Sequence, residues 1–112
     1  MHTVIETTPY LVDVERLFSA GEQAMIVDTV SANPRCGVVI PGTGGVRKLR
    51  VAASGRGKRG GARVIFLFGG DHVPVFLLAV FAKNERSDLS QAERNGIARM
   101  AAELLATYRS KR

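Results

Sequence analysis

The sequence predicts an α+β domain made of two short helices, an antiparallel meander of three strands and a final helix. Two capping-box signatures mark predicted helix starts, Ser19 with Glu22 and Ser90 with Glu93. Between them, apolar stretches rich in β-branched and aromatic residues alternate with glycine-rich turns, which is typical of strands. A chain of 112 residues can build one core of modest size, so we expect a single domain over residues 1–112.

The N-terminal third is predicted to form a short edge strand followed by two helices. Residues 3–6 are β-prone, and Pro9 suits the first turn of a helix over 9–18. The second helix begins at Ser19 and ends at Asn33, before a proline. Apolar side chains recur at helical spacing in both segments and should face the core. They are Leu11, Val14, Leu17 and Phe18 in the first helix, and Met25, Ile26 and Val30 in the second.

Three strands are predicted over residues 46–52, 63–68 and 73–83, joined as a meander. Because side chains alternate along a strand, each strand should divide its residues between two faces. The groups expected to share a face are Leu49 with Val51, Lys48 with Arg50, Arg63 with Ile65 and Leu67, and Leu77 with Ala79, Phe81 and Lys83.

The predicted C-terminal helix follows Ser90 and carries one apolar stripe. Its members are Ile97, Met100, Ala101, Leu104, Leu105 and Tyr108. The stripe indicates ordinary core packing or a surface that a partner helix covers.

Positive charge is concentrated in the middle of the chain. The formal net charge is +6, and residues 29–70 contain no Asp or Glu. The cations of this segment are Arg35, Arg47, Lys48, Arg50, Arg56, Lys58, Arg59 and Arg63. A localised surplus favours a docking surface for an anionic partner over a merely solvated face. Nucleic acid, an acidic protein or a membrane surface would each fit.

Several other classes of function find little support. Residues 55–60 match G-x-G-x-x-G, but a strand follows where a dinucleotide fingerprint must open a helix. Cys36 is the only cysteine, which fits a reducing cytoplasm and leaves no disulfide framework. No cluster of Cys, His and Asp suggests a metal, so we expect neither metal nor cofactor. The apolar stretch 64–81 is interrupted by the turn at 69–74, so no membrane span is expected.

A cationic site of this kind could bind RNA or cut it. RNA can be cleaved by its own 2′-hydroxyl if cations stabilise the phosphorane and groups nearby move the protons. Arginine supplies fixed charge, and a lysine crowded by other cations has a lowered pKa, so that it can exchange protons near neutral pH. An exposed aromatic beside Arg63 and Lys83 could stack a splayed base. Phe81 is the candidate, with burial in the core as its alternative.

Three blocks of sequence resemble a known family. They are P-G-T-G-G-V-R-K-L-R-V-A at 41–52, G-R-G-K-R-G-G-A-R-V-I at 55–65 and F-A-K-N-E-R-S-D-L-S at 81–90. They resemble the HigB-like branch of the RelE/ParE superfamily, the toxins of bacterial type II toxin–antitoxin pairs. The resemblance implies helices packed on one face of a twisted, mainly antiparallel sheet of 3–5 strands, with the basic face open. It also implies a cytoplasmic, ribosome-dependent endoribonuclease that cuts mRNA and halts translation.

The resemblance implies roles for particular residues. Arg63 corresponds to the family's arginine that stabilises the cleaved phosphate, and Lys58 and Lys83 to lysines with acid–base or charge roles. The residues implied to hold mRNA and ribosomal RNA are Arg47, Lys48, Arg50, Arg56, Arg59 and Asn84. The implied protein partner is a cognate antitoxin with a helix-turn-helix DNA-binding part, whose complex with the toxin binds operator DNA. The positive charge of this chain predicts that an acidic segment of the antitoxin covers the basic face or the C-terminal helix.

One position departs from the family's pattern. Relatives often have tyrosine where this chain has Phe81, which can stack on a base but cannot donate a proton. Two alternatives therefore stand beside the nuclease. One is a ParE-like toxin that acts on gyrase without cutting RNA, and the other is an RNA-binding module whose chemistry is weakened.

Overall fold

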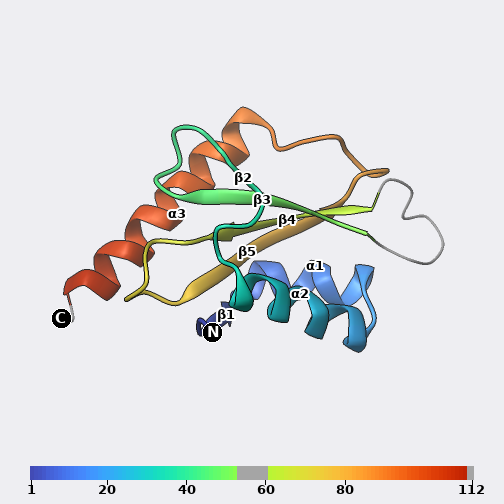
Figure 1. Cartoon of the computed structure of the whole chain (residues 1–112). Helices are drawn as coiled ribbons and strands as arrows, with labels where there is room; N and C mark the ends of the chain where they lie inside the picture. The colour runs from blue at the N-terminus through green and yellow to red at the C-terminus, as the bar shows by residue number, and fades with distance from the viewer. Residues whose placement is uncertain (53–60, 111–112) are drawn as a thin grey trace.

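The computed structural model describes residues 1–52 and 61–110, and its elements follow the predicted order (Figure 1). They are β1 (Val4–Glu6), α1 (Thr8–Leu17), α2 (Ala20–Ala32), β2 (Val38–Val39), β3 (Val46–Val51), β4 (Ala62–Leu67), β5 (Val75–Ala82) and α3 (Gln91–Ser110). No helix in these described ranges is long and apolar enough to cross a membrane.

The strands form one sheet in the order β1-β5-β4-β3-β2. The predicted meander is confirmed, because β3, β4 and β5 pair antiparallel in sequence. The opening strand does lie at an edge, where β1 pairs parallel with β5. The two-residue strand β2 was not predicted. It forms the other edge of the sheet, where Val38 pairs with Lys48 and Val39 with Arg47.

Helices cover both faces of the sheet, with α1 and α2 on one side and α3 on the other (Figure 1). The resemblance had implied helices on one face and an open basic face. The packing of α1 and α2 on one face agrees with this, but α3 covers part of the other face. The reason lies in β4, in which every residue is buried, so that both faces of the strand require a cover. Val64 and Phe66 pack toward α1 and α2, whereas Ile65 and Leu67 pack toward α3.

Local sequence explains how the N-terminal helices begin and pack. The Ser19 hydroxyl accepts from the backbone N–H of Glu22 at 3.2 Å, and the Glu22 carboxylate accepts from the backbone N–H of Ser19 at 2.9 Å, so the predicted capping box is confirmed. The buried face of α1 is Tyr10, Val14 and Leu17. The prediction for Met25 was wrong, since its side chain is 69% exposed.

A β-bulge changes which residues of β5 share a face. The register passes from Ile65 opposite Ala79 to Phe66 opposite Leu77, so β5 has one extra residue there. Leu77 consequently packs toward α1 and α2, and Phe81 packs toward α3. The sequence had placed both side chains on one face.

Candidate nucleic-acid interface

A groove of about 420 Å³ opens at the sheet, between the β2–β3 edge and the chain that follows β5. Four of its lining residues are cations that the sequence had singled out. The lining comprises Gly37, Val38, Lys48, Leu49, Arg50, Arg63, Lys83 and Ser87. Residues from β2, β3, β4 and the β5–α3 connection therefore meet at one surface.

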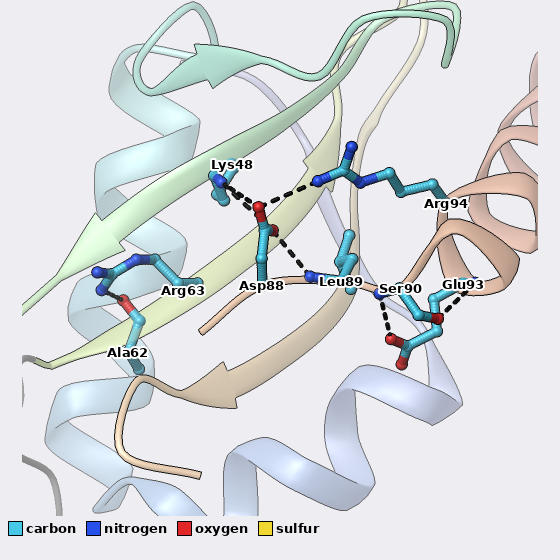
Figure 2. A network of polar contacts seen from close by, with 8 residues as sticks. All are labelled: Lys48, Ala62, Arg63, Asp88, Leu89, Ser90, Glu93 and Arg94. Carbon is cyan, nitrogen blue, oxygen red and sulfur yellow. Dashed lines mark hydrogen bonds and ion pairs between the residues drawn. The ribbon is translucent and has the colours of Figure 1, made fainter. Parts of the chain in front are cut away.

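Arg63 is the most deeply placed of these cations. Its side chain belongs to β4, where the residue is only 7% exposed, and its NH1 donates to the carbonyl oxygen of Ala62 at 3.3 Å (Figure 2). In the sheet register, Arg63 stands opposite Arg50 on β3 and Phe81 on β5. Like charges directly opposite each other on a sheet repel, so this arrangement is favoured when an anion lies between them.

Two further cations lie at the rim of the groove. Arg50 and Lys83 are both exposed, and neither side chain has a polar partner among residues 1–52 and 61–110. Backbone geometry fixes the position of Lys83, because its N–H donates to the carbonyl of Gly61 at 3.0 Å. Both side chains are available to an anionic ligand.

The structure also brings an acid to this basic surface. Asp88, in the β5–α3 connection, lies 3.4 Å from Nζ of Lys48 and accepts from NH2 of Arg94 at 3.1 Å (Figure 2). The backbone N–H of Leu89 donates to the same carboxylate at 2.8 Å. This N–H, followed by Lys48 and Arg94, lowers the pKa of Asp88. Asp88 lies within the motif block at residues 81–90, but its position beside Lys48 depends on tertiary folding.

Not every predicted RNA-binding residue lines the groove. Arg47 shares a strand face with Leu49, and its NH1 donates to the carbonyl of Arg35 at 2.8 Å. Asn84 is exposed next to Lys83 but does not belong to the lining. Three predicted residues lie outside the described part of the chain. They are Arg56, Lys58 and Arg59.

Phe81 is not the exposed aromatic that the sequence suggested. Its side chain is 3% exposed and belongs to the core beneath α3. The guanidinium of Arg86 lies over the ring, 4.7 Å from its centroid, and also binds the Glu93 carboxylate. The ion pair with Arg86 is the main cause that lowers the pKa of Glu93 to about 2. Phe81 therefore lies in the core, opposite Arg63 in the sheet register, and does not line the groove.

The geometry defines a class of protein, a small α+β domain with a groove lined by arginine and lysine. No group of three or more His, Cys, Asp or Glu suited to a metal occurs within residues 1–52 and 61–110. Comparison with protein families gives a more specific assignment. Residues 39–111 match the family described as the RelE toxin of the RelE/RelB toxin–antitoxin system. The chain therefore belongs to the RelE toxin family, within the RelE/ParE superfamily.

A solved structure supports the same fold. The chain is similar to a free-state structure of the Escherichia coli toxin RelE that carries two arginine-to-alanine substitutions. The match covers 88% of this chain and 95% of that chain, with 17% sequence identity and a TM-score of 0.59. The α+β fold predicted from the sequence is therefore confirmed.

Proposed function

We propose that this chain is a HigB-like, single-domain toxin that cuts mRNA on the translating ribosome and so inhibits translation. One observation carries the proposal: Arg63 lies nearly buried in a groove that it shares with Arg50, Lys48 and Lys83. Fixed cations in a partly enclosed site stabilise a developing phosphate charge more strongly than cations in open solvent. Membership of the RelE toxin family supports the same role.

The proposed chemistry uses only the RNA and this chain. The 2′-oxygen of the substrate attacks the adjacent phosphorus as its proton leaves, and the bond from phosphorus to the 5′-oxygen breaks. The products are a 2′,3′-cyclic phosphate and a free 5′-hydroxyl. Arg63 and Arg50 would stabilise the extra negative charge of the phosphorane, which is the role that suits arginine. Lys83, and Lys58 outside the described residues, would transfer protons to or from the reacting oxygens.

The remaining residues and partners follow from charge. Lys48, Arg47, Asn84, Arg56 and Arg59 would hold the RNA backbone through contacts that depend on salt. A cognate antitoxin with an acidic segment would neutralise the toxin by covering the basic groove or α3. Its helix-turn-helix part would bring the complex to operator DNA. High salt should weaken the toxin–antitoxin complex if the acidic segment supplies most of the affinity.

A second candidate is an RNA-binding protein that does not cut. One observation favours it: Phe81 has no hydroxyl and lies in the core, so it cannot donate a proton to a leaving group. The two candidates predict the same binding surface and differ only in product formation.

A translation extract that contains a labelled mRNA would separate them. We expect the wild type to cut only while ribosomes translate the message, and Arg63→Ala to be inactive. Arg99→Ala is the matched control, because Arg99 is an exposed cation on α3 outside the groove lining. Cutting by Arg63→Ala at the rate of Arg99→Ala would overturn the role given to Arg63 and its groove. Binding without cutting by the wild type would select the second candidate.

A further inference from the structure

The carboxylate of Asp88 occupies a position that an anionic ligand could take. It lies between Lys48 on β3 and Arg94 on the first turns of α3 (Figure 2). Three donors share its two oxygens: Nζ of Lys48, NH2 of Arg94 and the backbone N–H of Leu89. A phosphodiester also presents two oxygens that carry one negative charge. The carboxylate and the phosphodiester can therefore satisfy the same donors.

The guanidinium of Arg94 does not donate all of its hydrogen bonds to described residues in this arrangement. NH2 donates to Asp88, but Nε is buried and has no acceptor among the residues that the structure describes. These two nitrogens form one edge of the guanidinium, the edge that binds carboxylate and phosphate through paired hydrogen bonds. A ligand that reaches both nitrogens would satisfy Arg94 better than Asp88 does.

The position is continuous with the groove. Lys48 lines the groove together with Arg50 and Arg63, and Ser87, the neighbour of Asp88, lines it as well. An RNA strand that places one phosphate at Arg63 can therefore extend toward Lys48. The ion pairs of Asp88 are about one-third exposed, and solvent weakens pairs of this kind, so a ligand can displace the carboxylate at little cost.

We propose that Lys48 and Arg94 form a second phosphate subsite for RNA, and that Asp88 masks this subsite in the free protein. The proposal rests on the proposed function, because the ligand is a phosphate of the same RNA strand. An RNA phosphate displaces the Asp88 carboxylate and takes its place between the two cations. Asp88 therefore lowers the affinity of the free toxin for polyanions, and Arg94 belongs to the RNA-binding surface although the sequence did not indicate it.

The test compares two variants that remove the same charge from the same connection. Asp88→Asn removes the masking carboxylate. Glu85→Gln is the control, because the Glu85 carboxylate binds Arg16 of α1 at 2.7 Å and not a groove residue. The probe is a short 2′-O-methyl oligoribonucleotide, which binds but cannot be cut. Its affinity is measured by fluorescence anisotropy between about 50 and 200 mM salt, the range in which phosphate contacts produce large changes.

We expect Asp88→Asn to bind the probe roughly two- to fivefold more tightly than Glu85→Gln, the range that corresponds to one exposed ion pair. The slope of log affinity against log salt concentration should also be steeper for Asp88→Asn, by up to about 0.7, the value for one phosphate contact on a single strand. Adding Arg94→Gln to Asp88→Asn should abolish both gains. Arg94→Gln alone should weaken binding relative to the wild type.

Other results would overturn the proposal. If Asp88→Asn binds no more tightly than Glu85→Gln, or if its gain persists without Arg94, the Asp88 carboxylate is only a structural link. If Asp88→Asn does not fold, Arg94→Gln alone can test the proposal. Unchanged affinity of Arg94→Gln for the probe would exclude a phosphate at Arg94. If the wild type binds and cuts RNA normally while the variants give these results, only the second phosphate subsite is excluded and the proposed function stands. A wild type that binds no RNA would overturn both proposals.

Discussion

Glu93 links the cap of α3 to the arginine that covers Phe81, so its substitution should weaken both contacts. One carboxylate oxygen accepts from the backbone N–H of Ser90 at 2.8 Å, and the other binds NH1 of Arg86. Glu93→Gln keeps an oxygen for the cap but loses the charge. Glu93→Ala loses both interactions, so the two variants separate the ion pair from the cap.

The expected losses are small and differ between the variants. The lowered pKa of Glu93 would by itself suggest a larger value, but the two side chains of the ion pair are 40% and 38% exposed, so solvent reduces its contribution to about 0.5 kcal/mol. Glu93→Gln should lower the free energy of unfolding at pH 7 by that amount. Glu93→Ala should cost about 0.5–1 kcal/mol more, because the N–H of Ser90 loses its acceptor. Urea unfolding followed by circular dichroism would measure both values.

The ion pair should also show a defined dependence on pH. Folding lowers the pKa of Glu93 from 4.5 to about 2, so the charged form stabilises the fold above pH 4.5. This contribution is lost as the pH falls from 4.5 toward 2. The stability difference between the wild type and Glu93→Gln should therefore shrink over that interval. Equal stabilities at pH 7, or a gap that stays constant down to pH 2, would show that the charge of Glu93 does not stabilise the fold.

Three further variants test the packing that supports the site. Gly61→Ala should lower the free energy of unfolding by about 2 kcal/mol or more in thermal or urea unfolding, because φ is +72° there and the new Cβ would lie 2.3 Å from the carbonyl oxygen of Val51. Gly96→Ala, in open space within α3, should instead add about 0.5–1 kcal/mol, and a loss there would contradict the helical assignment. Tyr10→Phe should be neutral or stabilising by about 1 kcal/mol, because the buried hydroxyl has no hydrogen-bond partner in the ranges 1–52 and 61–110. A clear loss of stability would show that a bound water satisfies this hydroxyl.

Local signals in the sequence predicted the elements well. The two capping boxes depend on residues three apart, and both are present in the structure. Side-chain alternation correctly divided Arg63 and Ile65 from Val64 on β4. These features depend on residues a few positions apart, so they can be predicted from the sequence without tertiary information.

Features that depend on packing could not be predicted in the same way. Strand β5 is apolar on both faces, so no polar residue marks the bulge that separates Leu77 from Phe81. Met25 lies in a helix rich in apolar residues on every side, which hides the direction of the core. Phe81 is covered by Arg86, and that contact forms only once the β5–α3 connection folds back over the sheet.

The candidate site shows the same division. The sequence identified Lys48, Arg50 and Arg63 by their charge, and Lys83 by its strand face and the family resemblance. The fold brings all four to one groove. The sequence did not indicate Asp88, because its pair with Lys48 spans 40 residues and forms only in the folded chain. A surplus of charge in one segment therefore predicts a basic surface better than it predicts which of its charges are already paired.

The proposed activity is the cutting of mRNA by the groove around Arg63 during translation. Mapping of mRNA 5′-ends in cells, shortly after induction of the wild type and Arg63→Ala, tests it most directly. We expect new 5′-hydroxyl ends within translated codons for the wild type and none for the variant, with equal amounts of folded protein. Growth arrest without such ends, or the same ends in both strains, would contradict it.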